Sequence, residues 1–147
     1  MRMTPDYPPV WLMLFIALAW LQARVLPMGE AGAFRWSGTV LAVAGVGLMV
    51  LAAAQLFRAR TTIVPHEQPS ALVTGGIYRL TRNPIYLGDA LLLAGLVLRW
   101  GAWPSLILVP VFVAVITARF ILPEEARLRA AFGAEFDTYA SRVRRWI

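Results

Sequence analysis

The sequence predicts an all-α integral membrane protein with about four transmembrane helices and a C-terminal amphipathic cytoplasmic helix. Hydrophobic residues make up 59% of its 147 residues, whereas charged residues make up only 15%. Long apolar runs alternate with short polar segments. A soluble domain of this composition would expose much apolar surface, so we expect one domain, residues 1–147, within the lipid bilayer.

The first two apolar runs predict membrane-spanning helices over residues 7–26 and 38–57. No small-residue cleavage site precedes Pro27, so we interpret the first run as a signal anchor rather than a cleaved signal peptide. The second run is rich in glycine and alanine, which allow neighbouring helices to approach closely.

Prolines mark the start of two further helices. We expect one over residues 84–98, with Asn83 as its N-cap and Pro84 in its first turn. The other, over residues 104–121, also begins with a proline. Between the second and third helices, residues 58–83 contain several prolines and glycines and predict a loop.

The C-terminal residues 123–146 predict an amphipathic helix. Apolar residues follow one another in steps of three and four: Leu128, Phe132, Phe136, Tyr139, Val143 and Trp146. The opposite side is expected to carry Arg127, Arg129, Arg142, Arg144 and Arg145. We expect this helix to lie on the membrane or to pack across the ends of the spanning helices.

All fourteen basic residues are arginine, which indicates a GC-rich genome, and the net charge is +6. Most arginines lie at the ends of apolar runs, where they act as topology signals, so we expect no nucleic-acid partner. One side of the membrane would hold Arg24, Arg35 and Arg99. The other would hold most of the rest, among them Arg2, Arg58, Arg60, Arg79 and Arg82. We therefore expect a multi-pass protein of a bacterial inner membrane, with both termini and the central loop cytoplasmic.

The chain contains no cysteine and one histidine. This composition excludes disulfides, thiolate metal sites and a cysteine nucleophile, and we expect no metal site. We interpret His66 as an interfacial loop residue rather than a catalytic base.

One short polar stretch, residues 72–88, differs from its apolar surroundings. It combines two adjacent glycines, two arginines, two tyrosines and an Asn-Pro step. Each part has an ordinary explanation as a turn, a topology signal or a helix start. Together, the arginines, the tyrosines and the backbone amides of a helix N-terminus would suit a negatively charged or carboxylate-bearing ligand.

Three acidic residues each allow two interpretations. Glu124 and Glu125 either stabilise the start of a helix or bind a cationic group beside the arginines. Asp89 lies inside an apolar run, where an unpaired charge would be costly. It either pairs with Arg119 or lines a substrate cavity.

Two segments of the chain resemble the isoprenylcysteine carboxyl methyltransferase and phospholipid methyltransferase superfamily. They are GGIYRLTRNPIYLG, at residues 75–88, and EEARLRAAFGAEFDTYASRVRRW, at residues 124–146. The family pattern combines Gly-x-Tyr, Arg-(His/Asn)-Pro-x-Tyr-x-Gly and a Glu-Glu pair that follows a span. The resemblance implies an integral-membrane methyltransferase that depends on S-adenosylmethionine and holds it in a helical cytoplasmic pocket.

The resemblance also implies a set of site residues. The cofactor site would contain Val73, Gly75, Tyr78, Arg82, Asn83, Pro84, Tyr86, Leu87, Gly88, Glu124 and Glu125. Catalytic roles would fall to Arg82, Tyr86 and Asp89. Gly45-Val46-Gly47 resembles a glycine motif of phospholipid methyltransferases, although helix packing explains it equally well. Asn83 stands where carboxyl methyltransferases usually have histidine, which argues against a prenylcysteine substrate more than against the cofactor.

Methyl transfer from a sulfonium is an in-line displacement, so alignment and aromatic, cation-tolerant surroundings such as Tyr78 and Tyr86 can carry much of the rate. A carboxylate or thiolate acceptor needs no base, whereas an amine would need Asp89 or Glu124. We expect a lipophilic or membrane-associated acceptor: isoprenylcysteine carboxylate-like, a phospholipid amine or a small thiol. Two alternatives stay open, an NADPH-dependent sterol-type membrane reductase and a small membrane adaptor that binds anionic lipid.

Overall fold

The computed structural model describes residues 6–147, and Arg2 lies outside this range. The described chain is all-helical, as predicted. Its helices are α1 (Pro8–Val25), α2 (Phe34–Arg58), η1 (Gly76–Arg79), α3 (Pro84–Trp100), η2 (Trp103–Ile107), α4 (Leu108–Ile116), the π-helical segment η3 (Thr117–Ile121), α5 (Leu122–Phe132) and α6 (Ala134–Arg142).

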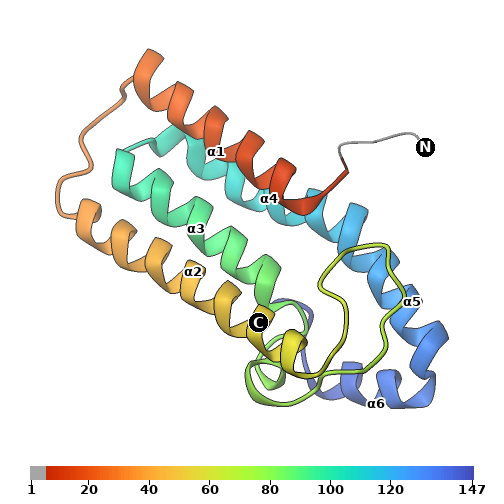
Figure 1. Cartoon of the computed structure of the whole chain (residues 1–147). Helices are drawn as coiled ribbons and strands as arrows, with labels where there is room; N and C mark the ends of the chain where they lie inside the picture. The colour runs from red at the N-terminus through yellow and green to blue at the C-terminus, as the bar shows by residue number, and fades with distance from the viewer. Residues whose placement is uncertain (1–5) are drawn as a thin grey trace.

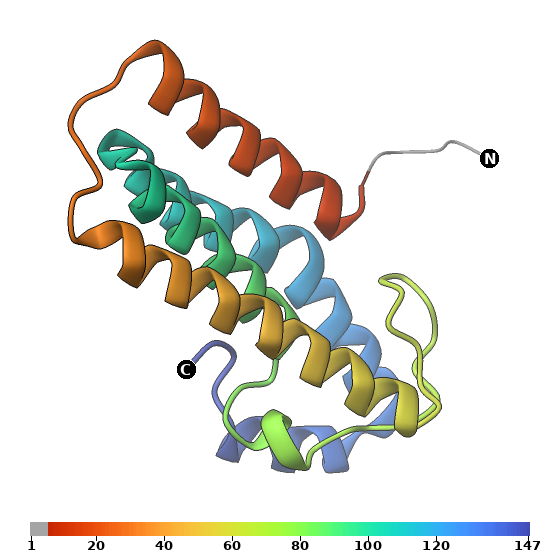
Figure 2. The ribbon, with the colours of Figure 1, turned by 60° about the vertical axis from the view of Figure 1, so that its left-hand side comes forward.

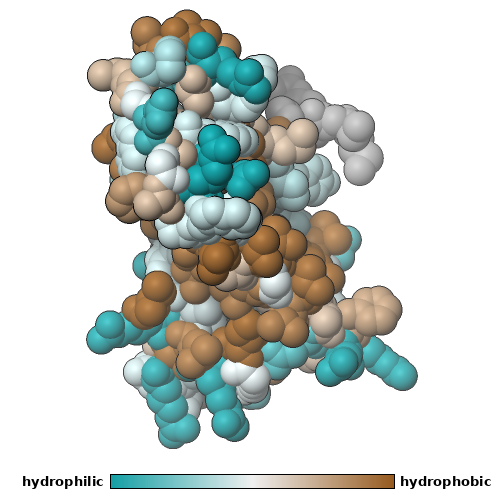
Figure 3. All heavy atoms as spheres, turned by 90° about the vertical axis from the view of Figure 1, so that its left-hand side faces the viewer, coloured by the Kyte–Doolittle hydropathy of each residue, from teal (hydrophilic) through white to brown (hydrophobic). Residues whose placement is uncertain are grey.

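Three helical stretches are long and apolar enough to span a membrane: Pro8–Val25, Phe34–Arg58 and Trp103–Phe132. α3, with 17 residues, lies between α2 on one side and α1 and α4 on the other (Figure 1 and Figure 2). Large hydrophobic side chains are exposed on the outside of the bundle, and hydrophobic residues cover much of the surface in Figure 3. The protein is therefore an integral membrane protein with α3 at its centre.

Glycines bring α2 and α3 into close contact. A Cβ atom on Gly45 would lie 2.6 Å from the carbonyl oxygen of Gly88, and one on Gly38 would lie 2.5 Å from that of Gly95. A side chain at either position would therefore push the two helices apart. Gly47 has open space beside it, so helix packing explains only the first glycine of the Gly-Val-Gly triplet.

A hydrophobic core joins α3 to α1 and α4. Phe15 of α1 and Phe112 of α4 meet edge to face, with ring centroids 5.4 Å apart. Leu93 and Val97 of α3 are completely buried in the same core. This packing fixes α3 relative to the helical stretch that leads into α5.

The third stretch that can span a membrane, Trp103–Phe132, widens into a π-helical segment at residues 117–121, just before Pro123. Inside a helix, a proline ring clashes with the carbonyl group four residues earlier, here that of Arg119. A wider π turn relieves this clash without ending the helix. The stretch continues as α5, which carries Glu124 and Glu125 beyond the apolar residues.

The C-terminal region differs from the single helix that the sequence predicts. Gly133 has φ 52° and ψ −124°, and the chain turns there from α5 into α6. α6 ends at Arg142, and Val143 is extended. The apolar stripe packs across the ends of α2 and α3, where Phe136, Tyr139 and Val143 are buried. Of the two arrangements expected for this region, packing on the helix ends is the one observed.

Candidate functional site

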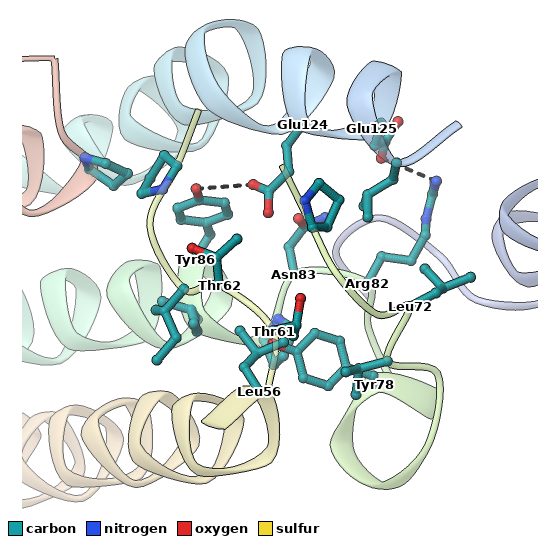
Figure 4. Close-up of a pocket in the computed structure, with 18 of the residues that line it drawn as sticks. Leu56, Thr61, Thr62, Leu72, Tyr78, Arg82, Asn83, Tyr86, Glu124 and Glu125 are labelled. Atoms are coloured by element: carbon teal, nitrogen blue, oxygen red, sulfur yellow. Dashed lines mark hydrogen bonds and ion pairs between the residues drawn. The ribbon is translucent and has the colours of Figure 1, made fainter. Parts of the chain in front are cut away.

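A cavity of about 240 Å³ lies at the end of the bundle where α2 ends and α3 begins (Figure 4). Its lining comes from the start of α1, from α2 and the loop after it, from η1 and the first turns of α3, and from α5 and α6. The polar lining residues are Thr61, Thr62, Tyr78, Arg82, Asn83, Tyr86, Asp89, Glu124, Glu125 and Tyr139. Apolar lining residues include Met49, Leu56, Leu72, Val73, Leu128 and Phe136.

The loop between α2 and η1 folds back on itself beside the cavity. The Thr61 hydroxyl oxygen accepts hydrogen bonds from the backbone N–H groups of Ser70 at 3.2 Å and Ala71 at 3.4 Å. The Ser70 hydroxyl donates to the carbonyl oxygen of Arg60 at 2.8 Å. These bonds place both ends of the loop on the same cavity.

Gln55, near the end of α2, anchors the chain that follows this loop. Its Nε2 donates to the carbonyl oxygen of Gly75 at 3.0 Å, and its Oε1 accepts from the N–H of Ile77 at 3.2 Å. Gly76 lies between them with φ +55°, and a Cβ atom there would collide with the Gln55 side chain. The Gly-Gly step is thus a turn fitted to Gln55, and it positions Tyr78 in η1.

Glu125 forms the centre of a buried ionic network. Arg145 donates from Nε to Oε1 and from Nη2 to Oε2, both at 2.9 Å, and Arg82 Nη1 lies 3.1 Å from Oε1. A buried carboxylate requires such partners, and the bidentate geometry is the strongest form of this pairing. The prediction that Arg145 lies on the outer side of the C-terminal helix is therefore wrong, because this residue follows the helix and turns inward.

The C-terminal segment runs beside residues 81–83. The N–H of Arg82 donates to the carbonyl oxygen of Arg144 at 3.0 Å. The Thr81 hydroxyl and the Asn83 amide both donate to the carbonyl oxygen of Arg145, at 3.2 and 2.9 Å. Asn83 stands at the N-cap position of α3, as predicted, but its side chain binds this segment and does not cap the helix.

Glu124 has a different environment from its neighbour. The Tyr86 hydroxyl donates to Glu124 Oε2 at 3.3 Å, and among residues 6–147 no arginine forms a salt bridge with Glu124. Figure 4 shows its carboxylate directed toward Tyr86, whereas Glu125 is directed toward Arg82. Two adjacent acids therefore differ in role: one is neutralised by arginines and the other faces the cavity.

Asp89 also faces the cavity and is buried, with 4% of the residue exposed. The possible pair with Arg119 is not formed, because Arg119 Nε lies 3.2 Å from Oδ1 of Asp6 and its guanidinium covers the Trp11 ring. In the described part of the chain, Asp89 makes no salt bridge and its side chain makes no hydrogen bond. It is thus a second cavity acid without a cationic partner.

Tyr139 and Tyr78 connect α6 to η1. The Tyr139 hydroxyl donates to the carbonyl oxygen of Tyr78 at 2.6 Å. Burial raises the pKa of Tyr139 to about 12. Burial, and then the nearby charge of Glu124, also raise the pKa of Tyr78. Both phenols are therefore neutral at physiological pH.

The structure brings most of the predicted site residues to the cavity. Those that line it are Val73, Tyr78, Arg82, Asn83, Pro84, Tyr86, Asp89, Glu124 and Glu125. Three predicted residues are not among the lining: Gly75, Leu87 and Gly88. Gly75 binds Gln55, Gly88 packs against α2, and the N–H of Leu87 donates to Asn83 in the first turn of α3. His66 is exposed and does not line the cavity either.

Other residues of the site were not identified from the sequence. They are Gln55, Thr61, Thr62 and Tyr139, together with Arg145, which holds Glu125. Gln55 had a usable signal, since it is a polar residue near the end of an apolar run. Arg145 had none, because its sequence position suggests only one more basic residue in a basic segment.

The comparison with protein families identifies the chain. The family model described as phospholipid methyltransferase matches residues 33–135, more than half of the sequence. The chain belongs to the phospholipid methyltransferase family. The matched residues include the loop between α2 and η1, α3, Glu124 and Glu125, whereas Tyr139 and Arg145 lie beyond the match. Family membership implies a membrane methyltransferase. No curated protein and no solved structure matches the chain significantly.

Proposed function

We propose that the protein transfers a methyl group from S-adenosylmethionine to an amine carried by a membrane lipid. The observation that supports this proposal best is the pair of cavity acids, Glu124 and Asp89, neither of which forms a salt bridge within residues 6–147. An acidic cavity favours a cationic donor and an acceptor that is positively charged or neutral.

The residues present fit this cofactor. Glu124 offers a carboxylate to its cationic groups, and Arg82 Nε is a buried donor without a partner in residues 6–147, available to a carboxylate. Leu56, Leu72 and Phe136 offer an apolar surface for a nucleoside. When bound, S-adenosylmethionine supplies a methyl group on a sulfonium.

Tyr86 and Asp89 carry the chemistry that the protein itself supplies. The Tyr86 hydroxyl fixes Glu124, and its ring is suited to a cation beside it. A lipid amine is protonated at neutral pH and becomes a nucleophile only when it loses a proton. Asp89, on the turn that follows Tyr86 in α3, accepts that proton in the cavity.

The lining of the cavity supports an amine over the other acceptors. A carboxylate or thiolate acceptor would bring a negative charge beside two acids that form no salt bridge in the described part of the chain, which is unfavourable. Pro8 and Pro9 of α1 and Met49 of α2 extend the apolar lining, which suits a substrate with acyl chains. We propose that this cavity lies on the cytoplasmic side, because most of the arginines lie at this end of the helices.

Binding to purified protein in detergent tests the proposal. We expect titration calorimetry to show binding of S-adenosylmethionine and of its demethylated product, and no binding of NADPH. Glu124→Gln is expected to weaken cofactor binding about tenfold or more, because an ionic contact is lost. Glu135→Gln is the matched control, since this acid is exposed on α6.

Each alternative function predicts another result. Binding of NADPH alone would support a reductase, although Arg82, the arginine that lines the cavity, is engaged with Glu125. If neither molecule binds, the adaptor hypothesis is favoured. Equal affinity of the Glu124 and Glu135 variants would remove Glu124 from the cofactor site.

A further inference from the structure

A second hollow, of about 850 Å³, lies at the opposite end of the bundle from the cavity. It is lined by the three arginines that the sequence predicts on the side of the membrane opposite most other arginines. They are Arg24 in the last turn of α1, Arg35 in the first turn of α2 and Arg99 in the last turn of α3. Figure 3 looks onto this end, where hydrophilic side chains gather between hydrophobic ones. Three different helices thus bring their charges to one place.

The charge of this hollow is not neutralised within the described chain. None of the three arginines forms a salt bridge among residues 6–147, and the lining contains one acid, Glu30. Arg99 donates to the Thr39 hydroxyl, and the guanidinium of Arg24 lies 5.3 Å from the centre of the Trp20 ring. The hollow therefore carries an excess of positive charge that attracts an anion.

The surroundings of the hollow indicate which anion fits. It lies at the ends of helices that can span the membrane, and Trp20 and Trp100 line it as aromatic residues do at the membrane interface. Val25 and Met28, which are next in sequence to the lining residues Arg24 and Pro27, are 64% and 66% exposed. Apolar surface next to guanidinium groups suits a phosphate that is attached to acyl chains.

We propose that Arg24, Arg35 and Arg99 bind the phosphate headgroup of an anionic phospholipid in the leaflet opposite the cavity. The site is separate from the proposed methyl-transfer cavity and holds a lipid that is not the substrate. It also accounts for arginines on the side of the membrane where positive residues are otherwise disfavoured.

Native mass spectrometry of the full-length protein tests this proposal. Protein in detergent is mixed with phosphatidylglycerol or with phosphatidylcholine, and the lipid that stays bound is measured. We expect phosphatidylglycerol to be retained preferentially by the wild type and about 100-fold less by a variant in which Arg24, Arg35 and Arg99 are all changed to Gln. The matched control changes Arg58, Arg60 and Arg79, which are exposed at the other end, to Gln and is expected to retain the lipid.

Equal loss in the two triple variants would show non-specific attraction and overturn the proposal. Displacement of the lipid by millimolar inorganic phosphate, with phosphatidylglycerol and phosphatidylcholine retained alike, would indicate a free-phosphate site and overturn the lipid assignment. If the triple variant does not fold, the single variants Arg35→Gln and Arg99→Gln replace it. Each is then expected to lower retention about fivefold, and no reduction in either would contradict the proposal.

Discussion

Arg145, which follows the last helix, donates two parallel hydrogen bonds of 2.9 Å to Glu125 at the start of α5. The same residue accepts hydrogen bonds at its carbonyl oxygen from Thr81 and Asn83. One residue thus joins the C-terminal segment, the start of α3 and the acidic pair. Because Glu125 is held in this way, Glu124 is left to face the cavity.

We expect Arg145→Lys to lower the thermal stability of the protein and to weaken cofactor binding. A lysine cannot form the bidentate pair, so Glu125 would lose at least one of the two hydrogen bonds that residue 145 donates, at a cost of about 1–3 kcal/mol in the free energy of unfolding. Thermal unfolding in detergent measures this cost. Arg144→Lys is the control, because Arg144 is exposed and contributes only a backbone carbonyl group. Equal melting temperatures of the two variants would show that the bidentate pair is unimportant.

Asp89→Asn should slow methyl transfer to an amine roughly 100-fold while weakening cofactor binding less than Glu124→Gln does. Asparagine is similar in size but cannot accept the proton of the ammonium group. Since the amine loses this proton unaided at high pH, the rate of the variant should approach that of the wild type as pH rises. A pH profile of the turnover rate checks this expectation. Arg119→Gln is the control, because it tests the alternative role of Asp89 as the partner of Arg119 in an ion pair. A constant ratio of the two rates across the profile would exclude Asp89 as proton acceptor.

Gly45→Ala and Gly47→Ala should differ in stability although they lie two positions apart in α2. The methyl group at position 45 would lie 2.6 Å from the carbonyl oxygen of Gly88, whereas position 47 has open space. We expect the first variant to lose about 1–3 kcal/mol and the second to keep its stability. Denaturation in detergent distinguishes them, and similar losses in both would contradict the close contact of α2 with α3.

Raising the pH above 10 should loosen the packing of α6. The pKa of Tyr139 is about 12 in the folded protein and 10.0 in its ordinary state, so the unfolded chain loses its phenolic proton first. The stability gained from the neutral phenol is complete below pH 10 and is lost as the pH rises toward 12. The chain has no lysine and no cysteine, so the other side chains that titrate in this window are the remaining three tyrosines. Melting temperatures at pH 9 and pH 11 should differ less in Tyr139→Phe than in the wild type. The half-exposed Tyr7, changed to Phe, serves as control.

The order of the helices could be predicted from the sequence because apolar runs, prolines and glycines act locally. Pro84 begins α3 as its position indicates, and the run of small residues in α2 does meet another helix. The break at Gly133 was missed, since the apolar stripe continues through it at helical spacing and gives no sign of a turn.

The site could be predicted only in part. Arg82, Tyr86 and the acidic pair lie in short motifs, so the sequence pointed to them directly. Which of the two acids is free could not be predicted, because it depends on Arg145, twenty positions further along the chain. In the same way, whether Asp89 pairs with Arg119 depends on Asp6, which forms a salt bridge with Arg119. No regular spacing in the sequence indicates this contact.

Methyl transfer from S-adenosylmethionine to a lipid amine is the proposed reaction, and a radiolabel assay tests it without an indirect readout. Purified protein is incubated with cofactor that carries a tritiated methyl group and with vesicles that contain phosphatidylethanolamine, or phosphatidylcholine alone. We expect tritiated lipid only in vesicles that contain the primary amine, with much less label from Asp89→Asn and Glu124→Gln. Absence of labelled lipid, although the protein binds the cofactor, would contradict the assignment of an amine lipid as acceptor.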